Sequence, residues 1–271
     1  DKDFVYPEID KIGKISSATV YNARHIEKIL ELPLVDPGII KKAGFKVAVD
    51  CVNSVGGIII PDLLKALGVL EVIEIYTEPN GQFPHNPEPL PEHLTELSEK
   101  VKTSGAHIGF VVDPDVDRLA IVDEHGNMFG EEYTLVAVAD YVLKNTPGNT
   151  ASNLSSTRAL ADVTRGYGKK HFASAVGEVN VVAAMKEHDC VIGGEGNGGV
   201  IYPELHYGRD ALVGIAMFLT YLAKEGLSVS ELRKKYPAYV ISKNKITLSK
   251  EDNIDEVLSK LKSRFSDYPI N

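Results

Sequence analysis

The chain has 271 residues, of which 44% are hydrophobic and 25% are charged. These are ordinary globular values, and the length gives room for about two domains. The 38 acidic and 29 basic side chains leave a net charge of −9, so there is no basic excess to displace counterions from DNA or RNA. We therefore expect no nucleic-acid partner. No apolar run approaches the roughly 18 residues of a membrane span, and no signal-peptide pattern opens the sequence, so we expect no membrane partner either.

The only two cysteines, Cys51 and Cys190, lie far apart in apolar segments. A secreted fold of this size more often carries several cysteines at patterned spacing. We therefore expect both to be reduced thiols in the core, which indicates a cytoplasmic protein.

The first half of the chain alternates predicted helices and strands. After a tail over residues 1–20, apolar spacing predicts helix 22–32, strand 45–49, helix 58–67, strand 72–76, helix 94–102 and strand 108–112. Gly56 and Gly57 are predicted to form a loop, which places Pro61 in the first turn of the next helix. A long proline-rich loop is predicted over 79–91. This alternation is typical of a parallel sheet with helices on its faces.

The same rhythm returns in the second half. The predicted elements are helices 131–144, 159–167, 179–187 and 210–223, strand 190–192, and further on strand 245–248 and helix 253–265. Asp210 is predicted to cap its helix. The fold class we predict is α/β: two similar domains with mixed or parallel sheets and helices on both faces, plus fragments of flanking domains.

Three aspartates, Asp113, Asp115 and Asp117, stand at alternate positions directly after a buried strand. Residues 113–118 are called the aspartate loop below. Crowded carboxylates repel one another, and a divalent cation such as Mg²⁺ relieves that repulsion. Strand ends are also preferred ligand sites in open α/β sheets. Two alternatives stay open: a solvated acidic turn, and a phosphatase site with Asp113 as the nucleophile, although the Gly-Asp pair that such enzymes carry downstream is missing.

Residues 194–199, Gly-Glu-Gly-Asn-Gly-Gly, are called the glycine loop below. They contain a Gly-x-Gly-x-x-Gly pattern, but a strand-like segment follows it where a dinucleotide-binding motif requires a helix. Glu195 would also place a negative charge in a phosphate cradle. Glu195 and Asn197 instead offer acceptors and a donor to the hydroxyls of a sugar. A glycine-rich turn without a ligand is the alternative.

Taken together, these motifs resemble those of the α-D-phosphohexomutases. The segment Asp113-Pro-Asp-Val-Asp-Arg118 is similar to the family's magnesium loop, and the glycine loop is similar to its sugar-specificity loop. The proline-rich segment 81–90 and the turn 176–181 also match family motifs in the same order. The resemblance implies four domains: residues 1–21 would end the first, 22–128 form the second, 129–236 form the third, and 237–271 open the fourth.

The resemblance also implies the chemistry. Such an enzyme moves a phosphoryl group between the 1- and 6-hydroxyls of a hexose through a phosphoserine and a 1,6-bisphosphate. Mg²⁺ would be held by Asp113, Asp115 and Asp117, and Arg118 would be catalytic, facing the transferring phosphoryl group. The residues implied to bind the phosphorylated hexose are Glu195, Asn197 and Arg209. The preferred hexose and the oligomeric state are left open.

Two family motifs do not occur in the chain: the segment that carries the phosphorylated serine and the phosphate loop of the last domain. We therefore expect a fragment that is truncated at both ends and inactive alone. Glu178 stands where some members carry a basic or histidine residue, so no catalytic role is predicted for it. His85 is predicted to be structural or exposed. A phosphatase and a non-catalytic sugar-binding module remain the alternatives.

Overall fold

The computed structural model describes residues 5–240, 247, 249 and 253–267. Contacts divide the chain into two units, Asp1–Tyr239 and Val240–Asn271. In the second unit, helix α10 (Ile254–Arg264) follows Asn253, whose side chain accepts a hydrogen bond from the N–H of Glu256. This helix confirms the one predicted over 253–265. The strand predicted over 245–248 lies outside the described residues.

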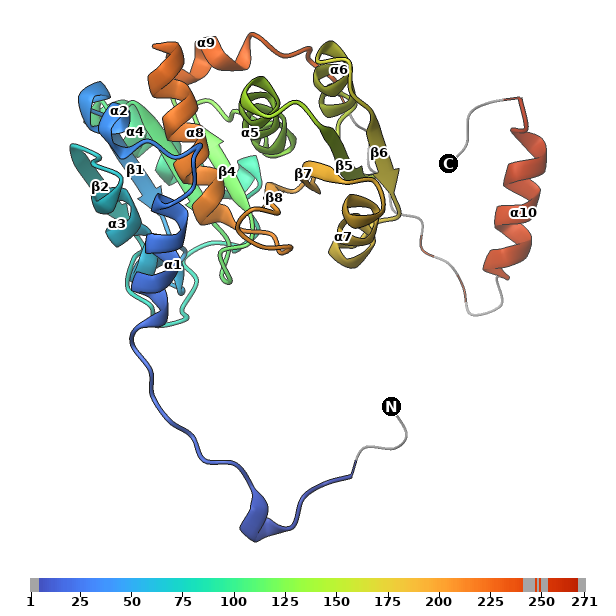
Figure 1. Ribbon diagram of the computed structural model, residues 1–271, viewed down its shortest axis with the longest axis horizontal. Helices are drawn as coiled ribbons and strands as arrows, with labels where there is room; N and C mark the ends of the chain where they lie inside the picture. The colour runs from blue at the N-terminus through green and yellow to red at the C-terminus, as the bar shows by residue number, and fades with distance from the viewer. Residues whose placement is uncertain (1–4, 241–246, 248, 250–252, 268–271) are drawn as a thin grey trace. The chain divides into compact units, whose positions relative to one another are not determined.

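The larger unit contains two four-stranded sheets with the same topology (Figure 1). The first sheet has the order β2-β1-β3-β4 and the second the order β6-β5-β7-β8. In each, the first three strands are parallel and the last is antiparallel. The strands are β1 (Lys46–Asp50), β2 (Glu71–Ile75), β3 (Ile108–Val112), β4 (Leu119–Val122), β5 (Asn149–Asn153), β6 (His171–Ser174), β7 (Cys190–Glu195) and β8 (Gly199–Ile201).

Helices cover both faces of each sheet, as the sequence predicts. One face of the first sheet packs on α4 through Leu97 and Val101, and one face of the second packs on α7 through Val181 and Met185. The opposite faces of the two sheets share one large hydrophobic core. The helices are α1 (Tyr21–Leu30), α2 (Pro37–Ala43), α3 (Gly56–Ala66), α4 (Thr95–Ser104), α5 (Glu131–Asn145), α6 (Ala159–Gly166), α7 (Glu178–Glu187), α8 (Ala211–Glu225) and α9 (Val229–Arg233).

The shared core arises because α5 and α8 cross between the two sheets. α5 follows the first sheet along the chain but also packs on β7 of the second. α8 follows the second sheet, yet its Phe218 meets Phe110 of β3 edge to face, with ring centroids 6.4 Å apart. The two helices lie side by side (Figure 1), and Tyr141 stacks on Tyr221 at 5.2 Å. This crossing joins the two sheets into one compact unit.

Some elements differ from the sequence prediction. Gly56 and Gly57 are not a loop but the first residues of α3, so Pro61 lies beyond the first turn. A Cβ at Gly57 would come within 2.0 Å of the Thr77 carbonyl oxygen, so glycine permits a close approach of the helix to the chain there. The strand β5 was not predicted because its sequence, Asn-Thr-Ala-Ser-Asn, lacks the apolar residues that mark a buried strand.

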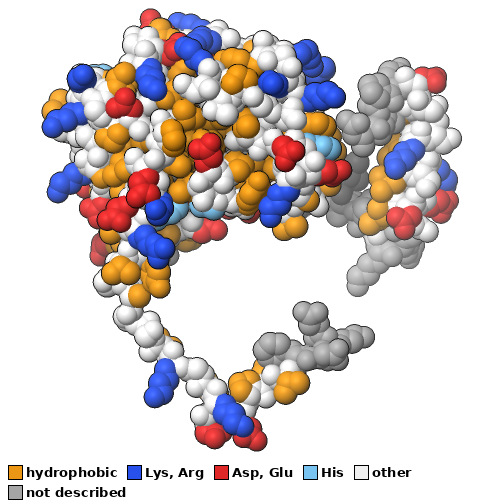
Figure 2. All heavy atoms as spheres, viewed as in Figure 1, with side chains coloured by type: hydrophobic (Ala, Val, Ile, Leu, Met, Phe, Trp, Pro, Cys, Tyr) orange, Lys and Arg blue, Asp and Glu red, His pale blue; other side chains and the backbone are white. Residues whose placement is uncertain are grey.

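The surface of the larger unit carries side chains of every kind. On the face drawn in Figure 2, acidic, basic and apolar side chains are interspersed over the compact unit. Within the described part of the chain, none of the helices is long and apolar enough to cross a bilayer. Cys51 and Cys190 are both buried free thiols, as predicted, and burial raises the pKa of each.

Candidate functional site

The candidate site lies where two hairpin loops meet. The aspartate loop joins β3 to β4, and the glycine loop spans the turn between β7 and β8. The backbone N–H of Leu119 donates to the carbonyl oxygen of Gly198 at 3.0 Å. Gly198 has a φ of +91°, and a Cβ there would lie 2.4 Å from the Leu119 oxygen, so this contact requires glycine. The two loops therefore touch at the carboxyl ends of two interior strands, where α/β sheets commonly bind ligands.

Asp113 organises the aspartate loop. Its side chain is buried, and its Oδ1 accepts hydrogen bonds from the N–H groups of Asp117 at 3.1 Å and Arg118 at 3.0 Å. Val116 has a left-handed φ of +62°, which is unfavourable for a β-branched residue. Its carbonyl oxygen accepts from the N–H of Ala211, the first residue of α8, at 3.0 Å. Tertiary contacts thus impose the conformation of this loop.

The three aspartates converge. One carboxylate oxygen from each of Asp113, Asp115 and Asp117 lies within 4.8 Å of the others. Burial raises the pKa of Asp113, and burial together with the Asp113 carboxylate raises the pKa of Asp117. Oδ1 of Asp117 is buried and has no hydrogen-bond partner among the described residues. Convergent oxygens that are costly to leave charged, one of them buried without a hydrogen bond, fit a divalent cation such as Mg²⁺.

Arg118 borders these aspartates. Its Nε lies 3.4 Å from Asp113 Oδ2 and 3.7 Å from Asp117 Oδ1, and its Nη1 lies 3.7 Å from Glu88 Oε1. The side chain is 30% exposed. It lines a cavity of about 350 Å³ with residues 86–88, 113 and 114. A planar guanidinium at the edge of a cavity suits a phosphate group.

Glu195 lies buried at the end of β7. Its Oε1 accepts a hydrogen bond from Asn153 Nδ2 at 2.7 Å, and its Oε2 accepts one from Arg209 Nη1 at 2.8 Å. Asn197 is half-buried, and its Oδ1 accepts from the N–H of Gly199 at 3.3 Å. Sequence reasoning missed Asn153, because the strand that carries it was not predicted. Asn197 Nδ2 also lies 3.5 Å from Glu195 Oε2, so Oε1 is the oxygen that keeps a second lone pair for a ligand hydroxyl.

Arg209 reaches both loops from the segment before α8. Its Nη2 forms an ion pair with Asp117 Oδ2, its Nη1 bonds Glu195, and its Nε lies 3.4 Å from Glu178 Oε2. The sequence pointed to Arg209 as a substrate-binding residue and assigned Glu178 no role. The structure brings both into one cluster with the two loops. The signal for Glu178 was its place in the family turn 176–181.

Asp50 and His85 pair beside the turn after β1, and that turn contacts the aspartate loop through Ser54. Asp50 ends β1 and is buried, which raises its pKa, and His85 Nε2 lies 3.0 Å from its Oδ2. His85 Nδ1 lies 2.8 Å from the carbonyl oxygen of Asn86, so Nδ1 carries a proton and the pair shares another. The Ser54 hydroxyl, in the turn after β1, donates to the carbonyl oxygen of Pro114 at 2.8 Å. The prediction that His85 is structural agrees with these contacts.

A second group of potential ligands, His25, His206 and Asp210, also converges. Asp210 caps α8, as predicted, and its Oδ2 lies 2.8 Å from His25 Nε2 and 3.0 Å from His206 Nε2. The N–H of Gly208 donates to His206 Nδ1 at 3.0 Å, which places the proton of the neutral ring on Nε2. That nitrogen donates to Asp210 and offers no lone pair to a metal. The group is therefore a hydrogen-bonded anchor between α1 and α8.

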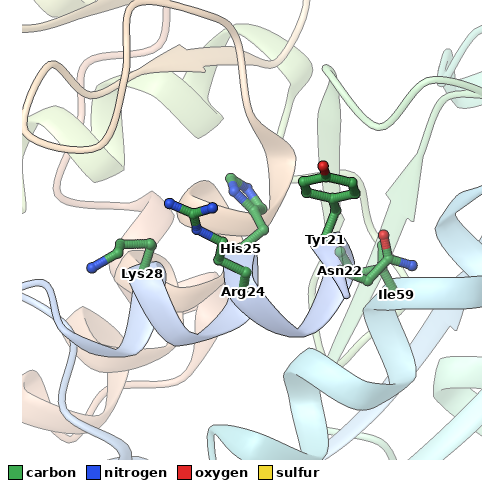
Figure 3. A pocket seen from close by; sticks show the side chains of 6 residues that line it. All are labelled: Tyr21, Asn22, Arg24, His25, Lys28 and Ile59. Carbon is green, nitrogen blue, oxygen red and sulfur yellow. The ribbon is translucent and has the colours of Figure 1, made fainter. Parts of the chain in front are cut away.

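A shallow cavity of about 440 Å³ lies beside this anchor (Figure 3). Its lining residues are Tyr21, Asn22, Arg24, His25 and Lys28 of α1 and Ile59 of α3. The Asp210 carboxylate raises the pKa of His25. Because the His25 side chain is 31% exposed, its protonation responds to the pH of the solvent.

These features describe a class of protein: a duplicated α/β sheet unit in which a candidate metal loop touches a candidate sugar loop. The family model "Phosphoglucomutase/phosphomannomutase, alpha/beta/alpha domain II" matches residues 23–126, and the model for domain III matches residues 130–239. The chain belongs to the phosphoglucomutase/phosphomannomutase family, as the sequence motifs predict.

Individual relatives agree with this assignment. The chain is 34% identical over 244 residues to a probable phosphoglucosamine mutase of Methanopyrus kandleri, covering 89% of this chain and 52% of that protein. It is 35% identical over 246 residues to a phosphoglucomutase/phosphomannomutase of Thermococcus kodakarensis, covering 90% of this chain and 53% of that one. A solved family protein from Burkholderia thailandensis superposes with a TM-score of 0.71 at 32% identity, over 81% of this chain and 47% of that one. The chain thus spans about half the length of the curated relatives it matches.

Proposed function

We propose that this chain supplies the metal-binding and sugar-binding parts of a phosphohexomutase, which interconverts hexose 1-phosphate and hexose 6-phosphate through a phosphoserine and a 1,6-bisphosphate. One observation carries the proposal: the glycine loop meets the end of the aspartate loop, because Leu119, the residue directly after that loop, donates its N–H to the carbonyl oxygen of Gly198. A divalent ion and a sugar held by these loops would lie next to each other. Phosphoryl transfer needs this proximity, because catalysis there depends on alignment and on neutralising charge.

Asp113, Asp115 and Asp117 would hold Mg²⁺, which supplies positive charge to stabilise a transferring phosphoryl group. Asp117 Oδ1, which is buried and accepts no hydrogen bond from the described residues, supports this assignment. Arg118 would face the phosphoryl group, since its guanidinium borders the same carboxylates and a cavity. An N-acetylphosphoglucosamine mutase of Aspergillus fumigatus, which shares the fold at 14% identity, was solved in complex with GlcNAc-6P and magnesium.

Glu195 and Asn197 would bind the hydroxyls of a phosphorylated hexose. Glu195 is held by Asn153 and Arg209, so its carboxylate has a fixed orientation before a ligand arrives. A fixed acceptor selects among sugars by the position of their hydroxyls. The proposal leaves open which of glucosamine, mannose and glucose phosphates is preferred.

The proposal also includes the division of the chain into domains, with boundaries near residues 21, 128 and 236.

The metal assignment is tested by titrating the chain with Mn²⁺, followed by electron paramagnetic resonance. Asp115→Asn keeps the shape of an exposed side chain and removes one ligand charge, so we expect Mn²⁺ affinity to fall about 100-fold or more. Asp62→Asn is the matched control, because it removes an exposed acid on α3. Equal Mn²⁺ binding by the wild type and Asp115→Asn would refute the metal site.

The activity is tested by incubating the chain with a hexose 1-phosphate and Mg²⁺. We expect no turnover by the chain alone, and isomerisation once the first and last domains of a relative are added. Isomerisation by the chain alone would contradict the expected need for those domains. Release of inorganic phosphate would instead favour the phosphatase with Asp113 as nucleophile, and sugar binding without chemistry in either case would favour a non-catalytic module.

A further inference from the structure

Arg209 is enclosed by carboxylates from three different elements. Asp117 belongs to the aspartate loop, Glu195 ends β7, and Glu178 begins α7. The Arg209 side chain is 13% exposed, and those of Asp117 and Glu195 are 18% and 6% exposed. One guanidinium therefore forms ion pairs with three carboxylates. Water has little access to Arg209, Asp117 and Glu195, so their charges interact strongly.

The main chain at Arg209 is fixed on both sides. The N–H of Arg209 donates to Glu178 Oε1 at 3.0 Å, and the N–H of Asp210 donates to the carbonyl oxygen of Val200 at 2.9 Å. Asp210 in turn caps α8. The side chain of Arg209 thus extends from a fixed origin, and Glu178 holds both its backbone and its Nε end.

The glycine loop is shaped around this side chain. A Cβ at Gly199 would lie 2.4 Å from Arg209 Cδ and 3.0 Å from Arg209 Cγ. Gly199 does not have a left-handed φ, so its backbone conformation does not call for glycine. The space that Arg209 occupies is what excludes a larger residue there.

We propose that Arg209 is the resident counter-ion of the site: it holds Asp117 to Glu195 when no divalent ion is bound, and it competes with such an ion for the charge of Asp117. This inference rests on the proposed function, because it takes the aspartate loop as the metal site. Arg209 pairs with Asp117 Oδ2, whereas Oδ1 accepts no hydrogen bond from the described residues and has only Arg118 Nε nearby, at 3.7 Å. The carboxylate can therefore bind an ion through Oδ1 while Oδ2 stays on Arg209.

Two opposite effects follow from this position. Without an ion, the guanidinium stabilises the fold, because Asp117, Glu178 and Glu195 would otherwise repel one another. When a divalent ion is present, the positive guanidinium repels it and weakens its binding. A neutral residue at 209 is therefore expected to destabilise the ion-free chain and to tighten ion binding. Removing the Glu178 charge is expected to do the reverse to ion binding, since more of the charge of Arg209 then acts on Asp117.

The test measures Mn²⁺ affinity by electron paramagnetic resonance and thermal unfolding with and without Mn²⁺, on the 271-residue chain. For Arg209→Gln we expect a lower Tm without ion, a dissociation constant for Mn²⁺ on the order of tenfold smaller, and a larger rise in Tm on adding Mn²⁺. Arg209→Lys keeps the charge and should bind Mn²⁺ within about twofold of the wild type. Arg165→Gln is the control, because Arg165 pairs with Asp162 at 2.8 Å while 72% exposed.

Equal or weaker Mn²⁺ binding by Arg209→Gln, with the wild type binding and Asp115→Asn not binding, overturns the counter-ion role and leaves the metal site standing. Absence of Mn²⁺ binding in the wild type overturns the metal site and the counter-ion role together. If Arg209→Gln does not fold, Glu178→Gln decides: weaker Mn²⁺ binding supports the role, and equal or tighter binding overturns it. Glu178 is 35% exposed, and glutamine keeps an oxygen that can accept from the Arg209 N–H, so we expect this variant to fold.

Discussion

The two sheets of the larger unit have the same strand order, yet the loops at equivalent positions carry different chemistry. The loop after β3 gathers three carboxylates, whereas the loop after β7 gathers glycines around Glu195. The neighbouring strands also end differently, since β1 ends in a carboxylate, Asp50, and β5 ends in an amide, Asn153. The shared fold sets where these loops lie, and the residues at the strand ends set what each loop can bind.

The largest expected effect removes the hydrogen bond between His85 and the buried carboxylate at the end of β1. His85→Leu removes the imidazole from Asp50, whose side chain is 1% exposed, and leaves a buried carboxyl group without its hydrogen-bond partner. We expect the free energy of unfolding to fall by about 3 kcal/mol, measured by urea denaturation. His125→Leu, at a side chain 67% exposed, should change it by less than about 0.5 kcal/mol. Similar losses in both variants would contradict a stabilising role for the Asp50–His85 pair.

Asn153 holds the equivalent position at the end of β5. Its loss should lower the free energy of unfolding less, because its side chain is a neutral amide. Asn153→Ala removes the donor to Glu195 Oε1 and is expected to lower the free energy of unfolding by about 2 kcal/mol. Asn197 is the matched control, since its amide lies 3.5 Å from the other Glu195 oxygen and is half-buried. Asn197→Ala should cost less than about 0.5 kcal/mol in the same denaturation experiment. If Asn197→Ala lowers the free energy of unfolding more than Asn153→Ala does, Asn153 is not the residue that holds Glu195.

The smallest expected effect concerns the hydrogen-bonded anchor between α1 and α8. The Asp210 carboxylate raises the pKa of His25 above its usual 6.5, so the pair stabilises the fold fully below about pH 6.5 and less as pH rises through the raised value. Asp210 stays charged throughout, because the hydrogen bonds from His206 and His25 outweigh its burial and hold its pKa far below the usual range. Comparing wild type with His25→Gln from about pH 5.5 to 8.5, we expect the stability difference to shrink by less than about 1 kcal/mol. A difference that grows with pH would contradict this account.

Local patterns in the sequence were enough to predict several features. Asp113, Asp115 and Asp117 are close in sequence, so their convergence needs only a turn, and Asp210 precedes an apolar run that it caps. The strand over 108–112 is apolar throughout and agrees residue for residue with β3. Periodicity and capping report such short-range structure well.

Features that depend on distant residues could not be predicted in this way. Arg209 meets Asp117 and Glu178 only after both sheets have formed, and no sequence spacing encodes that meeting. The polar strand β5 is stable inside the fold because Thr150 bonds Thr164 and His171, partners that its own sequence does not reveal. Tertiary contacts override local propensity at such positions.

The most direct test of a single site made from two loops is the effect of bound Mn²⁺ on the proton resonances of a hexose 6-phosphate bound to the chain. If the aspartate loop holds the ion and the glycine loop holds the sugar, Mn²⁺ should broaden the sugar resonances strongly, and Asp115→Asn should abolish the broadening. If the ion and the sugar each bind and the sugar resonances stay sharp, the two loops do not form one site.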